Sequence, residues 1–243
     1  MTFCACETDR PYGPVASGRF AGHAITFDCS GAAYFPELSL LVISDLHLER
    51  GAAHARRGFF LPPYDTAQTL NALAAVVRRY QPLRIVSLGD SFHDRLGAQA
   101  MMPELRERLE ELAQTGEWIW ITGNHDPDGV GGLPGHESHE WNFEGLSFRH
   151  EPGGGPLPDA VEGEVCGHLH PAATLKRPGK SVRRPCFAAD DKRLMLPAFS
   201  TKAGGLDLKH SAFSGLFDRK KLNVHMLGPD RVYSFPFAEL NRR

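Results

Sequence analysis

Side chains that can bind metal ions follow three successive apolar segments of the sequence. Asp45 and His47 come directly after the first segment, Asp90 after the second, and Asn124 and His125 after the third. If these segments are neighbouring strands, their carboxyl ends open into one crevice, where α/β proteins collect functional groups. The order of these residues therefore predicts one polar site at the edge of a sheet.

Two later segments add imidazoles to this set. His150 follows another predicted strand, and His168 and His170 follow a further one in the sequence Gly-His-Leu-His. The predicted donors are Asp45, His47, Asp90, Asn124, His150, His168 and His170. Seven oxygen and nitrogen donors without a thiolate exceed the four ligands of a tetrahedral zinc site. They suit two metal ions that share a carboxylate, an arrangement that supports in-line displacement at phosphorus.

Each part of this set also has a plainer interpretation. An Asp-x-His sequence after a strand is often a capping or core pair, and Gly-Asp is a common turn dipeptide. His168 and His170 could be surface neighbours on one strand, and His150 could be satisfied by hydrogen bonds within the fold. Five such clusters, each at the end of a predicted strand, favour a metal centre when they are taken together.

The elements that position these residues alternate between strand and helix before the chain becomes rich in strands. Continuous apolar runs predict strands buried on both faces at 38–44, 83–88 and 118–122. Predicted helices span 65–80 and 103–115. Asp65 and Gln68 have the spacing of a capping box at the start of the first helix. The later predicted strands span 145–149, 164–166, 182–187, 194–199, 221–227 and 232–235. This order predicts an α/β domain with two sheets packed face to face and helices outside.

The beginning of the chain differs in composition from the rest. Residues 1–18 are rich in Gly, Pro and polar side chains, so we expect a flexible lead-in before a single domain at 19–243. Within that domain, the segments 19–27 and 32–35 flank a Cys-Ser-Gly turn and are typical of a hairpin.

The overall composition excludes some classes of protein. The 27 Lys and Arg residues against 29 Asp and Glu residues leave a net charge of −2, which argues against binding nucleic acid by charge alone. The hydrophobic content of 42% argues against a disordered chain. Five cysteines without repeated spacing argue against a disulfide framework, and neither a signal peptide nor a membrane helix is predicted. We therefore expect a cytoplasmic protein.

Taken in order, the motifs Asp-x-His, Gly-Asp, Gly-Asn-His, His and Gly-His-x-His resemble the signature of the calcineurin-like binuclear metallophosphoesterase superfamily. The resemblance implies a four-layer α-β-β-α sandwich with two packed mixed sheets. The residues implied to hold metal one are Asp45, His47 and His170. The residues implied to hold metal two are Asn124, His150 and His168, with Asp90 as the bridge.

Two histidines outside the ligand set have catalytic roles implied by the same resemblance. His125 matches the non-ligand histidine that contacts the scissile phosphate and helps the leaving oxygen depart. His93 stands where protein phosphatases of the superfamily have an aspartate, and this departure resembles the nuclease branch. The alternative for His93 is that it only packs against or caps the following loop.

Further segments resemble a narrower group, the bacterial ligase-associated DNA damage response endonucleases. They include 44–51, 55–58, 166–171 and 184–206. This resemblance implies a manganese-dependent endonuclease that cleaves single-stranded DNA in DNA repair, grouped with a DNA ligase, a helicase and an exonuclease. Oxygen and imidazole ligands favour manganese or iron, although zinc remains compatible with the donor set.

Two other functions stay open at this point. A phosphodiesterase or pyrophosphatase for a small nucleotide or a lipid precursor would use the same metals, and a metal-free interaction module would use none. Arg56 and Arg57 are candidate substrate-binding residues because they follow the first metal loop closely. A second basic group contains Lys176, Arg177, Lys180, Arg183 and Arg184. Each basic residue could equally be part of a solvated surface.

Overall fold

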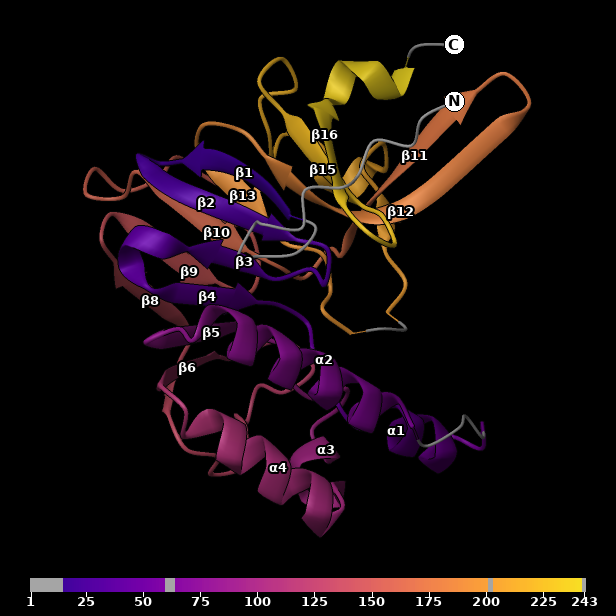
Figure 1. The fold of residues 1–243 in the computed structure, drawn as a ribbon. Coiled ribbons are helices and arrows are strands. Elements are labelled where there is room, and N and C mark those ends of the chain that lie inside the picture. Colours follow the sequence, from indigo (N-terminus) through magenta and orange to yellow (C-terminus); the bar gives the residue numbers. More distant parts are fainter. Residues whose placement is uncertain (1–14, 60–63, 201–202, 242–243) are drawn as a thin grey trace, which may run out of the picture.

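Two mixed β-sheets packed face to face dominate the computed structural model, which describes residues 15–59, 64–200 and 203–241 (Figure 1). The first sheet has the spatial order β1 (Val15–Phe20), β2 (His23–Asp28), β3 (Ala33–Phe35), β4 (Leu40–Ile43), β5 (Arg84–Leu88), β6 (Glu117–Ile121) and β7 (His136–Ser138). The second sheet has the order β14 (Leu206–Asp207), β11 (Pro171–Arg177), β12 (Lys180–Ala189), β13 (Arg193–Met195), β10 (Gly163–Cys166), β9 (Leu146–Arg149) and β8 (Glu140–Phe143). Strand β15 (Asn223–Leu227) pairs with β12, and β16 (Val232–Pro236) pairs with β15. The predicted pair of mixed sheets is confirmed.

The centre of the first sheet is parallel and carries the first three ligand clusters at its carboxyl edge. Strand β4 pairs in parallel with β5, and β5 with β6, so that all three strands end at the same side. All four residues of β4 are buried, because one face meets the helices and the other meets the second sheet. Burial on both faces explains why this strand has a continuous apolar sequence rather than an alternating one.

The helices lie on the outer face of the first sheet (Figure 1). They are α1 (Arg50–Arg56), α2 (Asp65–Tyr80), α3 (Gly97–Ala100) and α4 (Pro103–Ala113). The stripe containing Leu70, Leu73 and Val77 on α2 packs with Leu109 of α4 in one apolar cluster. The predicted helix at 65–80 is confirmed. The predicted capping box is wrong, because the Asp65 carboxylate instead accepts a hydrogen bond from the Gly51 N–H at 3.0 Å and ties α2 to α1.

The outer face of the second sheet has a thinner cover. The 3₁₀ helices on this face are η2 (Ser211–Phe213) and η3 (Phe237–Asn241), whereas η1 (Pro36–Leu38) joins β3 to β4 in the first sheet. Phe213 of η2 and Phe237 of η3 pack with Ala173, Cys186 and Met226 in a separate apolar cluster. The fourth layer of the sandwich therefore contains, in the described residues, the 3₁₀ helices η2 and η3 rather than long α-helices.

The beginning of the domain differs from the prediction. The segment 19–27 was expected as one strand, but Ala21 and Gly22, both with positive φ, turn the chain between β1 and β2. Residues 15–18 of the predicted lead-in belong to β1, and residues 1–14 lie outside the described residues. The turn at 29–31 between β2 and β3 is confirmed. Among the described residues, no helix has both the length and the apolar character that crossing a bilayer requires.

Candidate metal centre

The structure brings all seven predicted ligands to one edge of the two sheets. Asp45 and His47 follow β4, Asp90 follows β5, and Asn124 follows β6. From the second sheet, His150 follows β9, and the remaining histidines follow β10. Five of the seven have positive φ, namely Asp45, His47, Asp90, His168 and His170. Left-handed backbone is costly for residues other than glycine, and its concentration at one site is typical of functional sites.

One group of donors contains Asp45, His47 and His170. One ligand atom from each of the three lies within 4.8 Å of the others. The Nε2 atoms of His47 and His170 are 3.2 Å apart, and His170 Nε2 is 3.1 Å from Asp45 Oδ1. This is the set expected for metal one.

A second group surrounds His150 Nε2. This atom lies 3.0 Å from Asn124 Oδ1 and 3.1 Å from His168 Nδ1. The Nδ1–H of His150 donates to the Leu88 carbonyl oxygen at 2.8 Å, which fixes the ring and leaves Nε2 with a lone pair. This is the set expected for metal two.

Asp90 lies between the two groups. Its Oδ1 is 3.4 Å from His150 Nε2, whereas its Oδ2 is 3.9 Å from His47 Nε2. One carboxylate oxygen thus faces each group, which is the placement that a bridging ligand needs. Burial is the main cause that raises the pKa of Asp90, opposed by His150. Nearby positive charge would oppose this shift and favour the ionised carboxylate.

The two donor groups fit metal ions because atoms that carry lone pairs face one another within each group. The Nδ1–H of His170 donates to the Gly204 carbonyl oxygen at 2.9 Å, so a neutral ring directs only a lone pair at Asp45 Oδ1. That oxygen is buried and has no hydrogen-bond donor in the described part of the chain. A cation between such atoms removes the repulsion, and two carboxylates, an amide and four imidazoles suit divalent ions.

The charges of the site favour the forms that bind metals. Burial alone would raise the pKa of Asp45, but His170 and, to a lesser degree, His150 lower it to about 2. Burial lowers the pKa of His47 to about 3, against the opposing effect of Asp45. At neutral pH the carboxylate is therefore ionised and this imidazole is neutral, as metal coordination requires.

Close packing around the ligands depends on glycine at two positions. A Cβ atom at Gly167 would collide with Ser44 Oγ and would lie 2.6 Å from Asp45 Oδ2. A Cβ atom at Gly89 would lie 2.5 Å from His150 Nδ1. The glycines that precede the ligands therefore let the loops of the two sheets approach each other.

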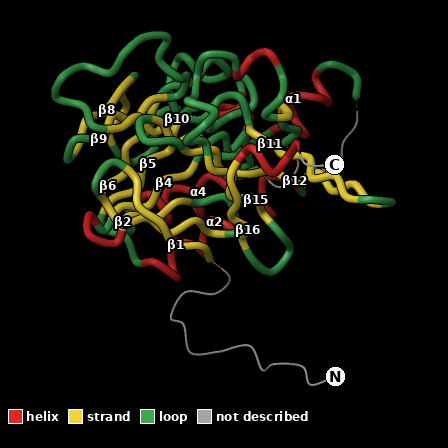
Figure 2. Tube along the Cα trace, turned by 90° about the horizontal axis from the view of Figure 1, so that it is seen from above, coloured by secondary structure: helices red, strands yellow, loops and turns green. Residues whose placement is uncertain are grey.

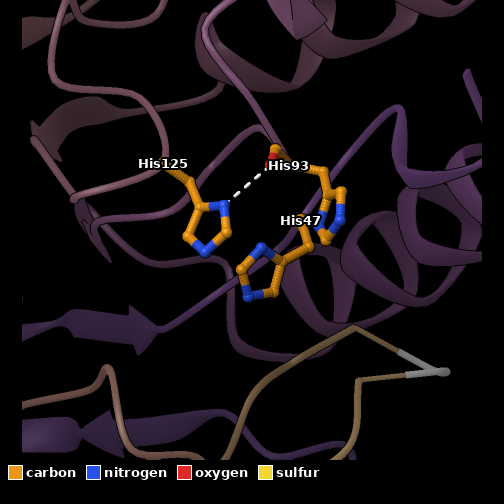
Figure 3. Close-up of side chains that lie close together, drawn as sticks. All are labelled: His47, His93 and His125. Carbon is orange, nitrogen blue, oxygen red and sulfur yellow. Dashed lines mark hydrogen bonds between the residues drawn. The ribbon is translucent and has the colours of Figure 1, made fainter. Parts of the chain in front are cut away.

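His93 and His125 lie next to His47 of the first group, and the three imidazoles come from separate loops (Figure 3). His93 and His125 are stacked with ring centroids 5.4 Å apart, and both rings stand nearly perpendicular to His47. The Nδ1–H of His125 donates to the His93 carbonyl oxygen at 2.8 Å, so its Nε2 is free to carry a proton toward a ligand. Burial, together with His125, lowers the pKa of His93 to about 4.

The sequence reasoning missed two residues that support these loops. His54 of α1 stacks on His93 with centroids 5.3 Å apart, and its Nδ1–H donates to the Arg50 carbonyl oxygen. Asp126 accepts hydrogen bonds from the N–H groups of Gly123 and Phe92, which joins the loops after β6 and β5. Asp126 directly follows His125 and is visible in the sequence as part of Gly-Asn-His-Asp, but no role is predicted for it from the sequence. His54 lies on a helix that the sequence did not reveal.

The two predicted substrate-binding arginines lie at the end of α1. The Arg56 guanidinium binds both carboxylate oxygens of Asp94 at 2.6 Å. Although partial burial opposes the effect, this arginine lowers the pKa of Asp94. Arg57 is exposed, and its positive charge contributes to the lowered pKa of His93. A role for either arginine in substrate binding remains a prediction.

Comparison with known proteins agrees with this geometry. A sequence model of the family described as calcineurin-like phosphoesterases matches residues 38–191. No curated protein sequence matches the chain significantly. The crystal structure of the nuclease MPE from Pseudomonas putida is similar, with a TM-score of 0.69 and 25% sequence identity over 91% of this chain and 100% of that one. The phosphoesterase Yfce from E. coli has a TM-score of 0.41 and 17% identity over 81% of this chain and 98% of its own.

Proposed function

This chain belongs to the calcineurin-like phosphoesterase family of metal-dependent hydrolases, and from that premise we propose that it is an endonuclease that hydrolyses phosphodiester bonds in single-stranded DNA. The observation that carries the proposal is the stacked pair of His93 and His125 beside the first donor group. A phosphodiester is negatively charged, and imidazoles at this position can receive it where a carboxylate would repel it. The similarity to a nuclease structure supports the same substrate class.

The residues that would hold two divalent ions are those of the two donor groups. Asp45, His47 and His170 would hold one, and Asn124, His150 and His168 the other, with Asp90 shared between them. When bound, such ions supply Lewis-acid activation of the phosphoryl group and of the attacking water. We propose manganese as the physiological ion because the donors are carboxylate, amide and imidazole without a thiolate.

His125 is positioned to assist the leaving oxygen. Because its Nδ1–H is used by the His93 carbonyl, a proton carried on Nε2 points away from that bond and can pass to the departing sugar oxygen. Its Nε2 lies 3.8 Å from Asp90 Oδ2, which keeps the ring next to both donor groups. In this proposal His93, which stacks on His125, contacts a non-bridging phosphate oxygen. The amide N–H of His125 also donates to Asp90 Oδ1 and fixes the loop.

One panel of substrates tests the proposal. The full chain is incubated with circular single-stranded DNA, duplex DNA, bis-para-nitrophenyl phosphate or small nucleotides, each with manganese, zinc or magnesium. We expect linearisation of the single-stranded circle, fastest with manganese, because only an internal cut opens a circle. Hydrolysis of the small phosphoesters with an intact circle would instead favour a small-molecule phosphodiesterase or pyrophosphatase. The matched inactive control is Asn124→Ala, which removes one oxygen ligand at an exposed position.

We also propose a role in DNA repair together with a DNA ligase, a helicase and an exonuclease, on the basis of the motif resemblance alone. Affinity capture with the wild-type chain, followed by identification of co-purified proteins, tests this association. Recovery of none of the three enzyme classes after crosslinking would contradict it.

A further inference from the structure

Strands β11 and β12 form a hairpin that extends beyond the body of the protein. Both Figure 1 and Figure 2 show this hairpin projecting away from the two sheets. It starts at Pro171, the residue directly after the ligand His170. The seven residues of β11 span about 20 Å at about 3.3 Å per residue. The hairpin, which we call the arm, therefore begins next to the metal centre, and its turn lies well outside that centre.

The arm is strongly basic. Residues 171–189 contain five Lys and Arg residues and no acidic residue, in a chain whose net charge is −2. Within the described part of the chain, Lys180, Arg183 and Arg184 take part in no salt bridge, and all three are exposed. Positive charge that is not neutralised by the protein is available to an anionic ligand.

The register of the hairpin divides the basic side chains between two faces. Thr174 pairs with Arg183 and Lys176 pairs with Ser181, so these four side chains share one face. Lys180, Val182 and Arg184 alternate with them and lie on the opposite face. Of Lys176, Lys180, Arg183 and Arg184, one lysine and one arginine therefore lie on each face.

The face with Lys176 and Arg183 continues the side of β12 that packs against the first sheet, and Arg183 contacts the loop next to His170. Along β12, Phe187 is on the same side as Arg183 and packs between the two sheets, whereas Cys186 packs in the outer cluster with Ala173. The Arg183 guanidinium donates to the Gly205 carbonyl oxygen, and the neighbouring Gly204 carbonyl accepts from the ligand His170. We call the surface of Lys176, Ser181 and Arg183 the inner face of the arm.

We propose that the inner face of the arm binds backbone phosphates of a single-stranded nucleic acid on one side of the scissile bond. The proposal rests on the proposed function and names the part of the chain that holds the strand outside the metal centre. Arg183 uses one of five N–H donors on Gly205, so the others can bind phosphate oxygens. Lys176 lies farther along the same face and supplies a second contact through its ammonium group. A polyanion that leaves the metal centre meets these cations in succession, which accounts for nucleic-acid binding by a chain of negative net charge.

Two double variants with equal loss of charge test the inner face. Binding of a fluorescent oligothymidylate to the full chain in EDTA is measured as a function of salt concentration. Each phosphate contact on a single strand contributes about 0.7 to the slope of log Kd against log salt. We therefore expect K176Q/R183Q to lower that slope by about 1.4 and K180Q/R184Q, on the opposite face, to keep the wild-type slope. Equal slopes for the two variants, or no binding by the wild type, would overturn the proposal.

A third variant removes the concern that Arg183 also supports the His170 loop. K176Q leaves the Gly205 contact in place and is expected to lower the slope by about 0.7. An unchanged slope in K176Q overturns the proposal even if the double variant loses affinity. The proposed function fails separately, if the wild type with manganese hydrolyses bis-para-nitrophenyl phosphate but leaves circular single-stranded DNA intact.

Discussion

The imidazole of His125 is held by the main chain of His93, because its Nδ1–H donates to the His93 carbonyl oxygen at 2.8 Å. This bond joins the loop after β6 to the loop after β5 and selects the tautomer of the neutral ring. It turns Nε2 toward the two donor groups, where a scissile phosphate would lie. A general acid requires this combination of a fixed ring and an unused nitrogen.

Replacing His125 with alanine should affect natural and activated substrates differently. A departing sugar oxygen needs a proton, so H125A should lower kcat for single-stranded DNA by roughly 10²- to 10⁴-fold. The p-nitrophenolate ion leaves without a proton, and hydrolysis of bis-para-nitrophenyl phosphate should fall far less. The measurement is kcat for both substrates at saturating manganese. Equal losses for the two substrates would show that His125 does not donate the proton.

The seven ligands should contribute unequally to metal binding. Asp90 directs one oxygen at each donor group, so Asp90→Ala should reduce the bound manganese from two ions per chain to fewer than one. The imidazole of His168 contacts the second group, whereas only its backbone N–H reaches Asp45 of the first, so His168→Ala should leave one ion bound and abolish activity. Metal analysis after gel filtration measures both values, and circular dichroism confirms that each variant is folded. Two ions retained by the Asp90 variant would contradict a bridging role.

The convergence of the candidate ligands could be predicted from the sequence because their positions follow from simple rules. Parallel strands buried on both faces have continuous apolar sequences, and the polar residues that follow them meet at one edge. Asp45, Asp90 and Asn124 each come within three residues of the end of such a strand. The helix at 65–80 was equally visible because its apolar stripe has helical spacing.

Other features depend on contacts between segments that are distant in sequence. Helix α1 begins after Glu49, which has left-handed backbone and no side-chain cap, so no start signal marks it. The stacking of His54 on His93 could not be predicted from the sequence for the same reason. The length of the β11–β12 arm depends on pairing of Thr174 with Arg183 beyond the edge of the sheet, which residue types alone do not reveal.

Adding one methyl group at Gly167 should disrupt the metal centre. The new Cβ atom of Gly167→Ala would collide with Ser44 Oγ, and the loops of the two sheets would have to separate. Such overpacking costs about 1 to 3 kcal/mol of unfolding free energy. We expect a lower melting temperature and weaker manganese binding, measured by calorimetry on apo and loaded protein.

The matched control for that substitution is Gly154→Ala. No atom lies within 4 Å of a Cβ atom built at Gly154. Its melting temperature should equal or slightly exceed that of the wild type, because alanine restricts the unfolded chain. Equal melting temperatures for Gly167→Ala and Gly154→Ala would show that the close approach at Gly167 does not affect stability.

Stability at acidic pH should depend on His225, which lies far from the ligand set in β15. Its ring stacks on Phe27 with centroids 3.9 Å apart, and its Nδ1 lies 2.7 Å from Ser234 Oγ. Burial lowers the pKa of His225 from 6.5 to about 4. The unfolded chain therefore binds a proton at His225 more tightly than the folded chain does. The contribution of neutral His225 to folding stability is complete above about pH 6.5 and is lost as the pH falls toward 4. The loss is about 2 kcal/mol, less than the full shift implies because the ring is partly exposed.

The pH dependence of His225→Phe isolates this effect. Phenylalanine keeps an aromatic ring against Phe27 but cannot be protonated, so the variant should lose less stability between pH 6.5 and pH 4 than the wild type. Urea unfolding in EDTA at several pH values measures the difference, and His47 and His93 titrate equally in both proteins and cancel. Parallel stability curves would mean that His225 is already accessible to protons in the folded state, and the buried stack would then have no role in acid unfolding.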